Sequence, residues 1–330
     1  MKSMLFALLI AFLAVLAMGP FVIPLLRRLS FGATERDYGL DSHKKKAGTP
    51  IMGGVMMLIA LGVASIVFAP AETRWTVMLP MVLFTLGFSL LGLADDVIKA
   101  VLKRPEGLMP WQKIVVQLLL LSGGAACFCY FSPYIGHAIY IPFTSVQWDM
   151  GWLYIPFAMF VIIAVVNSVN LLDGVDGLCS SVTTVVMLVL GLIALFMNQT
   201  GLDEAASGNV MVLCLATAGA CMGFLRFNTY PAKVFMGDSG SFALGGAYVM
   251  ASLVLRQPLL IVIMGIMYVL TSLSDIIQIG SIKLRHKKVF RMAPLHHHFE
   301  MGGVPETRIV AMYTLVTAIA CVVALLSLSL

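Results

Sequence analysis

Residues 152–198 read WLYIPFAMFVIIAVVNSVNLLDGVDGLCSSVTTVVMLVLGLIALFMN. Two apolar runs, 152–170 and 178–198, meet at the polar stretch NSVNLLDGVDGL, which covers 167–178. Each run has the roughly 20 residues that a helix needs to cross a bilayer. Because lipid offers the backbone no hydrogen bonds, runs of this length in a membrane are helices. The segment therefore predicts two membrane helices joined at one membrane face by acids and amides.

The composition of the whole chain indicates a membrane protein. Of the 330 residues, 60% are hydrophobic and only 11% are charged, and the mean hydropathy is +0.98; soluble domains carry about 25% charged residues. The six cysteines have neither the spacing of a disulfide framework nor a CxxC zinc motif, so we expect small buried hydrophobic residues. The net charge of +5 does not by itself indicate nucleic acid, and no nucleic-acid partner is expected.

Apolar runs recur along the chain and predict a single integral membrane domain over 1–330. The first run follows Lys2 as a signal peptide would, but it continues apolar to Leu26 and ends at two arginines, which favours a retained anchor. We therefore expect an all-α polytopic bundle of ten transmembrane helices. They are placed near 4–26, 51–69, 77–98, 113–131, 152–170, 178–198, 208–226, 239–256, 259–281 and 309–328.

The basic residues set the orientation of this bundle. With the N-terminus outside, all but three of the 21 Lys and Arg residues fall in inner loops; the exceptions are Lys2, Arg74 and Arg256. Such an excess marks the cytoplasmic side of a membrane protein. Both termini are therefore expected on the side away from the cytoplasm.

Five aspartates from distant parts of the chain fall on this basic face. They end two of the expected spans and begin a third, whereas the acids of the outer side lie in loops without motif character. Three consecutive histidines, in APLHHHFE, lie in a long loop on the same face. The acids and histidines that gather there are Asp95, Asp96, Asp173, Asp176, Asp238, His296, His297 and His298.

Each acidic group also has a purely structural interpretation. Asp238 precedes an apolar run and fits a helix N-cap, and Asp173 and Asp176 lie beside glycines and fit a polar turn. Asp95 and Asp96 fit a solvated helix end, although acids at a helix C-terminus need a positive partner. The spacing Asn-x-x-Asn-x-x-Asp-x-x-Asp instead predicts a polar stripe along one helix, which a plain turn does not require.

The histidines have three interpretations. A zinc site is disfavoured, because consecutive side chains point in different directions and the chain has no HExxH motif or cysteine partner. A loop without function and a set of donors to phosphate oxygens are the other two, and we favour the donors.

Lysines lie on the same face as the acids, at 44–46, Lys99 and Lys113. Some of them must simply anchor to anionic headgroups. Carboxylates also bind Mg²⁺, and Mg²⁺ with lysines neutralises phosphate oxygens. At a membrane interface, this combination predicts phosphoryl transfer between a soluble nucleotide and a lipid phosphate, a reaction that depends mainly on positioning and charge neutralisation.

Five motifs in this order resemble the phospho-N-acetylmuramoyl-pentapeptide transferase family, a branch of the polyprenyl-phosphate N-acetylhexosamine-1-phosphate transferases. The motifs are GTPIMGG, GLADDVIK, NSVNLLDGVDGL, NTYPAKVFMGDSGS and FRMAPLHHHFE. The resemblance covers about 28–307. APLHHHFE favours the muramoyl-pentapeptide branch over its nearest alternative, a polyprenyl-phosphate N-acetylglucosamine-1-phosphate transferase.

The resemblance implies a concrete reaction. Phospho-N-acetylmuramoyl-pentapeptide moves from its UDP carrier (UDP-MurNAc-pentapeptide) to undecaprenyl phosphate, which gives lipid I and UMP for peptidoglycan synthesis. It also implies a Mg²⁺ cofactor, ten helices with periplasmic termini, and a site on the cytoplasmic face of the bacterial inner membrane. The oligomeric state stays open, with a homodimer as one arrangement.

The resemblance also assigns residues. Asp95 and Asp96 match the paired acids, Asp238 matches the metal-binding acid, and His296 joins them as a catalytic candidate. Phe235 matches a position that stacks on the uracil base. The positions that match contacts to the substrates are Lys46, Thr49, Lys99, Lys113, Asn170, Asp173, Gly174, Asp176, Asn228, Phe235, His297 and His298.

Two positions depart from the family pattern. Val175 stands where leucine is expected, and Thr271 stands where relatives often have glutamate, with Asp275 four residues later. An acid inside a span costs about 2.5–3.5 kcal/mol on insertion scales. Asp275 should therefore have a partner, either a basic residue or the active-site cleft.

Alternatives remain for both mechanism and class. Direct attack by the lipid phosphate, with Asp95 as a base, and a phospho-aspartate intermediate are both open. Neighbours on a helix differ by about 100° in direction, so only one of Asp95 and Asp96 should face the lipid phosphate. An anion transporter would place its polar groups near the membrane midplane, whereas these spans are apolar there, and a structural scaffold does not explain five acids on one face.

Overall fold

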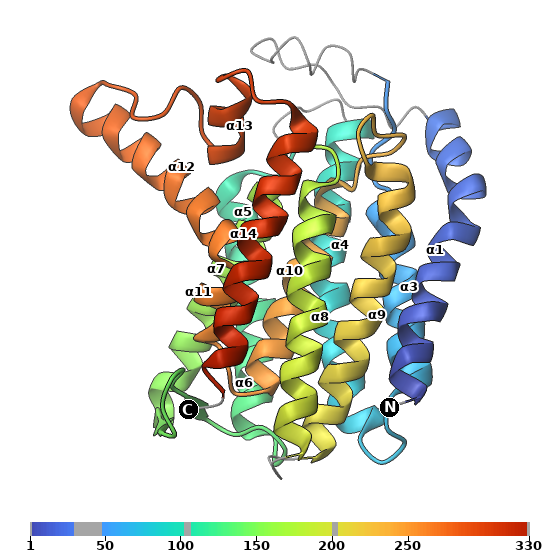
Figure 1. The fold of residues 1–330 in the computed structure, drawn as a ribbon, viewed down its shortest axis with the longest axis vertical. Helices are drawn as coiled ribbons and strands as arrows, with labels where there is room; N and C mark the ends of the chain where they lie inside the picture. Colours follow the sequence, from blue (N-terminus) through green and yellow to red (C-terminus); the bar gives the residue numbers. More distant parts are fainter. Residues whose placement is uncertain (1, 30–47, 102–106, 200–203, 329–330) are drawn as a thin grey trace.

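The computed structural model describes residues 2–29, 48–101, 107–199 and 204–328. Helices make up about three quarters of this part of the chain, as the apolar runs predict (Figure 1). The first half contains α1 (Lys2–Arg28), α3 (Gly54–Phe68), the π-helix η1 (Arg74–Met78), α4 (Leu79–Val101), α5 (Pro110–Val116), the π-helix η2 (Gln117–Ser122) and α6 (Gly123–Phe131). The second half contains the 3₁₀-helix η3 (Gly151–Leu153), α7 (Tyr154–Leu172), α8 (Leu178–Gln199), α9 (Glu204–Asn228), α10 (Gly237–Val254), α11 (Leu260–Met264), α12 (Ile266–Arg285), α13 (Leu295–Glu300) and α14 (Glu306–Leu326).

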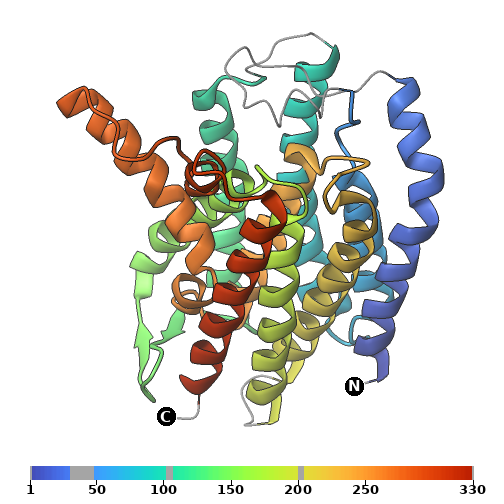
Figure 2. The same cartoon turned by 45° about the horizontal axis from the view of Figure 1, so that its top comes forward.

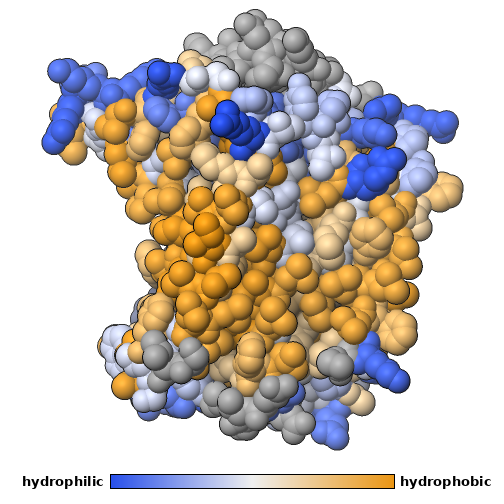
Figure 3. All heavy atoms as spheres, viewed as in Figure 1, coloured by the Kyte–Doolittle hydropathy of each residue, from blue (hydrophilic) through white to orange (hydrophobic). Residues whose placement is uncertain are grey.

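Within the described residues, six helical stretches are long and apolar enough to cross a membrane: Lys2–Arg28, Arg74–Ala100, Gly151–Leu172, Leu178–Asn198, Ala206–Asn228 and Glu306–Leu326. The other four apolar runs are also helical, but each is shorter, more polar or interrupted. α3 has 15 residues, α10 begins with Gly, Asp and Ser, η2 interrupts the path from α5 to α6, and Gly265 separates α11 from α12. Figure 3 shows a hydrophobic belt between two hydrophilic ends.

α10 lies in the middle of the bundle, and its residues 239–254 are all buried. It packs against α3, α4, α7 and α9. Small residues allow membrane helices to approach closely. Gly54 on α3 lies against Gly240, and Gly92 on α4 lies against the carbonyl of Asp238, so neither glycine has room for a Cβ. The backbones of three helices therefore meet where α10 begins.

The two ends of the bundle differ. The start of α1 and the end of α14 lie at one end, which we call the terminal end, and α13 lies at the other, which we call the α13 end (Figure 1). The chain therefore crosses the bundle an even number of times. α12 leaves the bundle and projects outward at the α13 end (Figure 2).

A small β-hairpin lies at the terminal end, between α6 and η3. Strands β1 (Ala138–Tyr140) and β2 (Gln147–Asp149) are antiparallel, with Ile139 opposite Trp148. The sequence analysis expected only a loop there. Strands of three residues are too short to produce a readable alternation of apolar and polar positions.

Candidate active site

Asp95 and Asp238 share two lysine side chains at the α13 end. Lys99 lies one turn after Asp95 on α4, and its Nζ is 2.6 Å from Asp95 Oδ2 and 2.7 Å from Asp238 Oδ2. Lys113, on α5, lies 2.9 Å from Asp95 Oδ2 and 3.6 Å from Asp238 Oδ2. These lysines are the positive partners that an acid at a helix C-terminus needs. The four side chains, which we call the carboxylate–lysine cluster, come from three helices.

Asn170 and the backbone complete the surroundings of the two carboxylates. Asn170, near the end of α7, donates its amide to Asp238 Oδ1 at 2.8 Å and to Ser241 Oγ at 2.9 Å. The backbone N–H of Leu108 donates to Asp95 Oδ1 at 2.6 Å. Burial would raise the pKa of Asp238, but its hydrogen bond with Asp95 and the charges of Lys99 and Lys113 outweigh burial and lower it.

Asp96 has a different role from its neighbour Asp95. Its two carboxylate oxygens accept the backbone N–H groups of Asp238 and Ser239, both at 3.0 Å. The first turn of α10 has no side-chain cap of its own, and Asp96 supplies the acceptor from α4. The N-cap interpretation of Asp238 is therefore wrong, because Asp238 lies inside the helix that Asp96 caps. Asp95 and Asp96 have different partners because neighbouring side chains on α4 point about 100° apart around the helix axis.

The predicted polar stripe on one helix is wrong in its second half. α7 ends at Leu172, so Asn170 lies on the helix while Asp173 and Asp176 lie in the turn that follows. Gly177, at φ 77°, requires a conformation that glycine adopts without strain. The turn nevertheless keeps both acids at the α13 end.

Asp173 and Asp176 have different surroundings within this turn. Burial raises the pKa of Asp173 to about 8, and the charges of Asp238, Asp96 and Asp176 add to the shift. Asp176 accepts the backbone N–H of Ala232 at 2.9 Å. Asp173 therefore lies within the field of the carboxylate–lysine cluster, whereas Asp176 ties its turn to the segment after α9.

The three histidines of α13 point to different partners. His296 is buried against Gly174, which has no room for a Cβ. His297 Nδ1 lies 2.5 Å from Glu300 Oε2, and the ring also interacts electrostatically with Asp275. His298 Nδ1 accepts the backbone N–H of Arg291 at 3.1 Å. The His296 ring thus packs on the turn that holds Asp173.

Two of the residues expected to contact the substrates, Asn228 and Phe235, hold loops together through hydrogen bonds. Asn228 accepts the N–H of Gly177 at 3.1 Å and donates to the carbonyl of Val234 at 3.0 Å. Phe235 pairs through its backbone with Pro50, at 2.8 Å, and with Gly53, at 2.9 Å. Thr49 directly precedes this pairing, and Lys46 lies outside the described residues.

Three groups that contact the site were not expected from the sequence. Ser241 binds Asn170, the N–H of Leu108 binds Asp95, and Glu306 at the start of α14 accepts the N–H of Asp176 at 3.3 Å. Ser241 lies one turn after Asp238 on α10, so the motif GDSGS could have indicated it. A backbone N–H leaves no such signal in a sequence.

The donor set fits a Mg²⁺ ion held jointly by protein and substrate. Lys99 Nζ lies within 2.7 Å of one oxygen each from Asp95 and Asp238, so two carboxylates already converge on one cation. Among the residues that the structure describes, no three His, Cys, Asp or Glu side chains form a metal cage. Mg²⁺ is usually held by one or two carboxylates with water and substrate phosphates, so a cage is not required.

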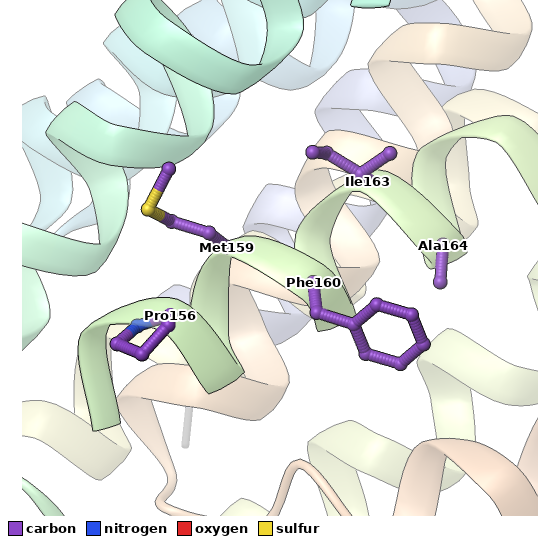
Figure 4. Close-up of a pocket in the computed structure, with 5 residues that line it drawn as sticks. All are labelled: Pro156, Met159, Phe160, Ile163 and Ala164. Carbon is purple, nitrogen blue, oxygen red and sulfur yellow. The ribbon is translucent and has the colours of Figure 1, made fainter. Parts of the chain in front are cut away.

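An apolar groove runs along α7 towards this site. Its lining consists of Pro156, Met159, Phe160, Ile163 and Ala164, all from one face of the helix (Figure 4). Ala164 lies six residues before Asn170 on the same helix, about 9 Å along the axis. The groove and Asn170 therefore lie on the same helix.

Known proteins resemble this chain over its whole length. The family described as glycosyl transferase family 4 matches residues 78–256. A phospho-N-acetylmuramoyl-pentapeptide-transferase of Clostridium novyi (strain NT) is 42% identical over 99% of this chain and 98% of its own. Enzymes of the same name from Clostridium kluyveri and Thermoanaerobacter sp. (strain X514) are 43% and 41% identical, over 99% and 100% of this chain and the full length of their own. The chain therefore belongs to the phospho-N-acetylmuramoyl-pentapeptide-transferase family.

Proposed function

We propose that this chain transfers phospho-N-acetylmuramoyl-pentapeptide from UDP to undecaprenyl phosphate, releasing UMP and forming lipid I for peptidoglycan synthesis. The observation that carries the proposal is the carboxylate–lysine cluster at one end of an apolar bundle, in a chain whose relatives have this activity in their name. The cluster offers charge at a membrane surface, where a nucleotide and a lipid phosphate can meet. The apolar groove on α7 supports an acceptor with a long hydrocarbon chain.

The reaction exchanges one phosphorus–oxygen bond for another. An oxygen of the lipid phosphate bonds to the phosphorus that carries the sugar, the bond from that phosphorus to the bridging oxygen breaks, and UMP leaves with the electron pair. Lys99 and Lys113 would bind and orient the phosphate oxygens, and Asn170 would hold Asp238 in place. Direct attack with Asp95 as base and a phospho-aspartate intermediate both fit these residues.

Mg²⁺ is part of the proposal. Asp238 would hold the ion, and Asp95 is the second carboxylate within reach of the shared cation position. When bound, the ion neutralises charge on the diphosphate. Lys99 would then contact phosphate rather than both carboxylates, and His296 would fix the turn of Asp173 from the opposite side.

We further propose ten membrane crossings, periplasmic termini and a site on the cytoplasmic face of the bacterial inner membrane. The sequence supports this, because all basic residues but Lys2, Arg74 and Arg256 fall in the loops that are expected on the inner side. The six long apolar stretches support the membrane location.

The test is release of UMP by the purified protein with UDP-N-acetylmuramoyl-pentapeptide, undecaprenyl phosphate and Mg²⁺. We expect release that needs all three, stops with EDTA and gives an equal amount of lipid I. Omission of the lipid phosphate is the matched control. Release only when UDP-N-acetylglucosamine replaces the muramoyl substrate would instead assign the chain to the N-acetylglucosamine-1-phosphate transferases.

A further inference from the structure

The far half of α12 has an apolar face that the described part of the chain does not cover. Ile276 and Ile279 are 65% and 54% exposed, and Leu284 near the end of the helix is 84% exposed. Figure 2 shows this part of α12 projecting from the bundle at the α13 end. In a membrane protein, such a face lies against lipid.

The chain after α12 is folded back in a fixed turn. His286 ends the helix in the left-handed conformation, at φ 53°. Ser281 donates its hydroxyl to the carbonyl of Lys287 at 2.8 Å. Gln278 accepts the N–H groups of Val289 and Phe290 and donates to the carbonyl of Phe290, each at 3.0 Å. The side chains of α12 thus bind the backbone of the segment that leaves it.

The last turn of α12 and the chain after it present four exposed cations: Lys283, Arg285, Lys287 and Lys288. No ion pair within the described residues includes any of them. Leu284 and Val289, which is 56% exposed, lie beside them in the sequence. Cations next to exposed apolar side chains at the end of a lipid-facing helix are typical of a segment in the headgroup layer, where anionic lipids attract Lys and Arg.

The turn is also linked to the candidate active site. Phe290 contacts His298 edge-on, with ring centroids 5.7 Å apart, and the N–H of Arg291 binds His298 Nδ1. His298 lies on α13, whose His296 packs against Gly174. A short chain of contacts therefore joins the four cations to the turn that holds Asp173.

We propose that residues 283–289, the anchor turn, bind anionic lipid headgroups and that this binding holds α13 against the site. The partner is a lipid rather than an acidic protein, because the cations share their surface with apolar side chains that continue along α12. The proposal extends the proposed function by naming a lipid that regulates the site. The proposal can be tested without measuring UMP release. A failure of this proposal can therefore be distinguished from a failure of the proposed function.

The test compares the purified chain in nanodiscs of neutral phosphatidylcholine and in nanodiscs that also contain phosphatidylglycerol. Hydrogen exchange of the backbone amides of 286–301 is the readout, because fixing the turn protects them. We expect exchange about tenfold slower with phosphatidylglycerol, the effect of between one and two cations near an anionic surface. High salt should remove the difference by screening.

Three variants make this test specific. Changing Lys283, Arg285, Lys287 and Lys288 together to Gln should abolish the response to phosphatidylglycerol. Changing the three lysines to Arg keeps the charge and should preserve the response. Arg27→Gln with Arg28→Gln, at the end of α1, removes exposed cations elsewhere and should also preserve it.

The unchanged exchange of α10 amides checks that each variant is folded. Equal exchange of the wild-type chain in both lipids would overturn the proposal, and so would full protection in the four-Gln variant. A third outcome is protection in neutral lipid that requires the addition of a second protein. That result would assign the anchor turn to a protein partner and would also overturn the proposal.

Discussion

Each end of the bundle holds a carboxylate paired with a basic side chain, but the surroundings are opposite. At the terminal end, His137 Nε2 lies 3.1 Å from Asp149 Oδ1, with side chains 39% and 68% exposed. At the α13 end, Lys99 Nζ lies 2.6 Å from Asp95 Oδ2, and the side chain of Asp95 is fully buried. The terminal pair joins neighbouring parts of one hairpin, whereas the carboxylate–lysine cluster joins three helices.

This difference shows whether the terminal pair or the carboxylate–lysine cluster has to be explained by function. An exposed ion pair contributes about 0–1 kcal/mol to folding, so the terminal pair is an ordinary surface contact. Burying charges costs several kcal/mol per ion before their attraction offsets it, so the α13 cluster is a weak way to stabilise a bundle. Stability therefore does not account for the buried cluster, whereas the function that we propose for it does.

Removing one charge from each end should give the largest contrast. Asp238→Asn should reduce UMP release by about 10²-fold or more, because it removes the proposed Mg²⁺ ligand and one of the two carboxylates that position the lysines. Asp149→Asn, at the terminal end, should leave release unchanged. Equal losses in the two variants would show that the buried cluster has no special role.

The pH dependence of the free energy of unfolding should reveal the buried acid Asp173 at the α13 end. Asp173 has a pKa of about 8 in the folded chain against an ordinary value of 3.8, so between these values only the folded state keeps the proton. Stability should therefore fall as pH rises from about 4 to 8, by at most about 1.4 kcal/mol per unit, and then level off. Asp173→Asn cannot ionise and should lose this fall.

Thermal unfolding in detergent with EDTA, at pH 5 and pH 9, measures this effect. Other groups titrate in the same range, so the difference between wild type and Asp173→Asn is the quantity to compare. The two proteins should be closest in stability at pH 5, and the variant should be favoured at pH 9. A variant with the wild-type pH profile would show that Asp173 is ionised in the fold.

The sequence predicted the helices and the gathering of acids at one end, because both follow from local patterns. Apolar runs mark helices, and the basic loops assign helix ends to faces. The partners of each acid could not be predicted. Whether Asp95 or Asp96 meets Lys113 depends on how α4 is rotated against α10, and a pattern of apolar residues does not fix that rotation to a fraction of a turn.

The end of α7 was missed for a related reason. Four polar residues at a spacing of three fit a helix, but Gly174 and Gly177 allow the chain to turn after Leu172. Gly174 is required there because His296, more than a hundred positions later, occupies the space of its Cβ. Contacts of that range are absent from a local reading of the sequence.

Substituting alanine for each of two glycines tests whether the packing of His296 is part of the site. Gly174→Ala places a Cβ against the His296 ring, and overpacking of this kind costs about 1–3 kcal/mol. UMP release should also fall, because the turn of Asp173 moves. Gly280, on α12, has open space around its Cβ position, so Gly280→Ala should raise stability by about 0.5–1 kcal/mol. Melting temperatures that fall equally in both variants would contradict a specific contact at Gly174.

The smallest effect is expected at the terminal end itself. Asp149 Oδ1 also accepts the N–H of Gly151 at 2.9 Å, and asparagine keeps that acceptor while it removes the charge. Asp149→Asn should therefore lower the free energy of unfolding by no more than about 1 kcal/mol. Asp95→Asn removes the fully buried partner of Lys99 and Lys113 and leaves them Asp238 alone, so it should lower this free energy by more than Asp149→Asn does, by up to about 3–5 kcal/mol. If thermal unfolding gave the two variants the same loss, burial would not be what distinguishes the ends of the bundle, and the case for a ligand at the α13 end would lose its energetic basis.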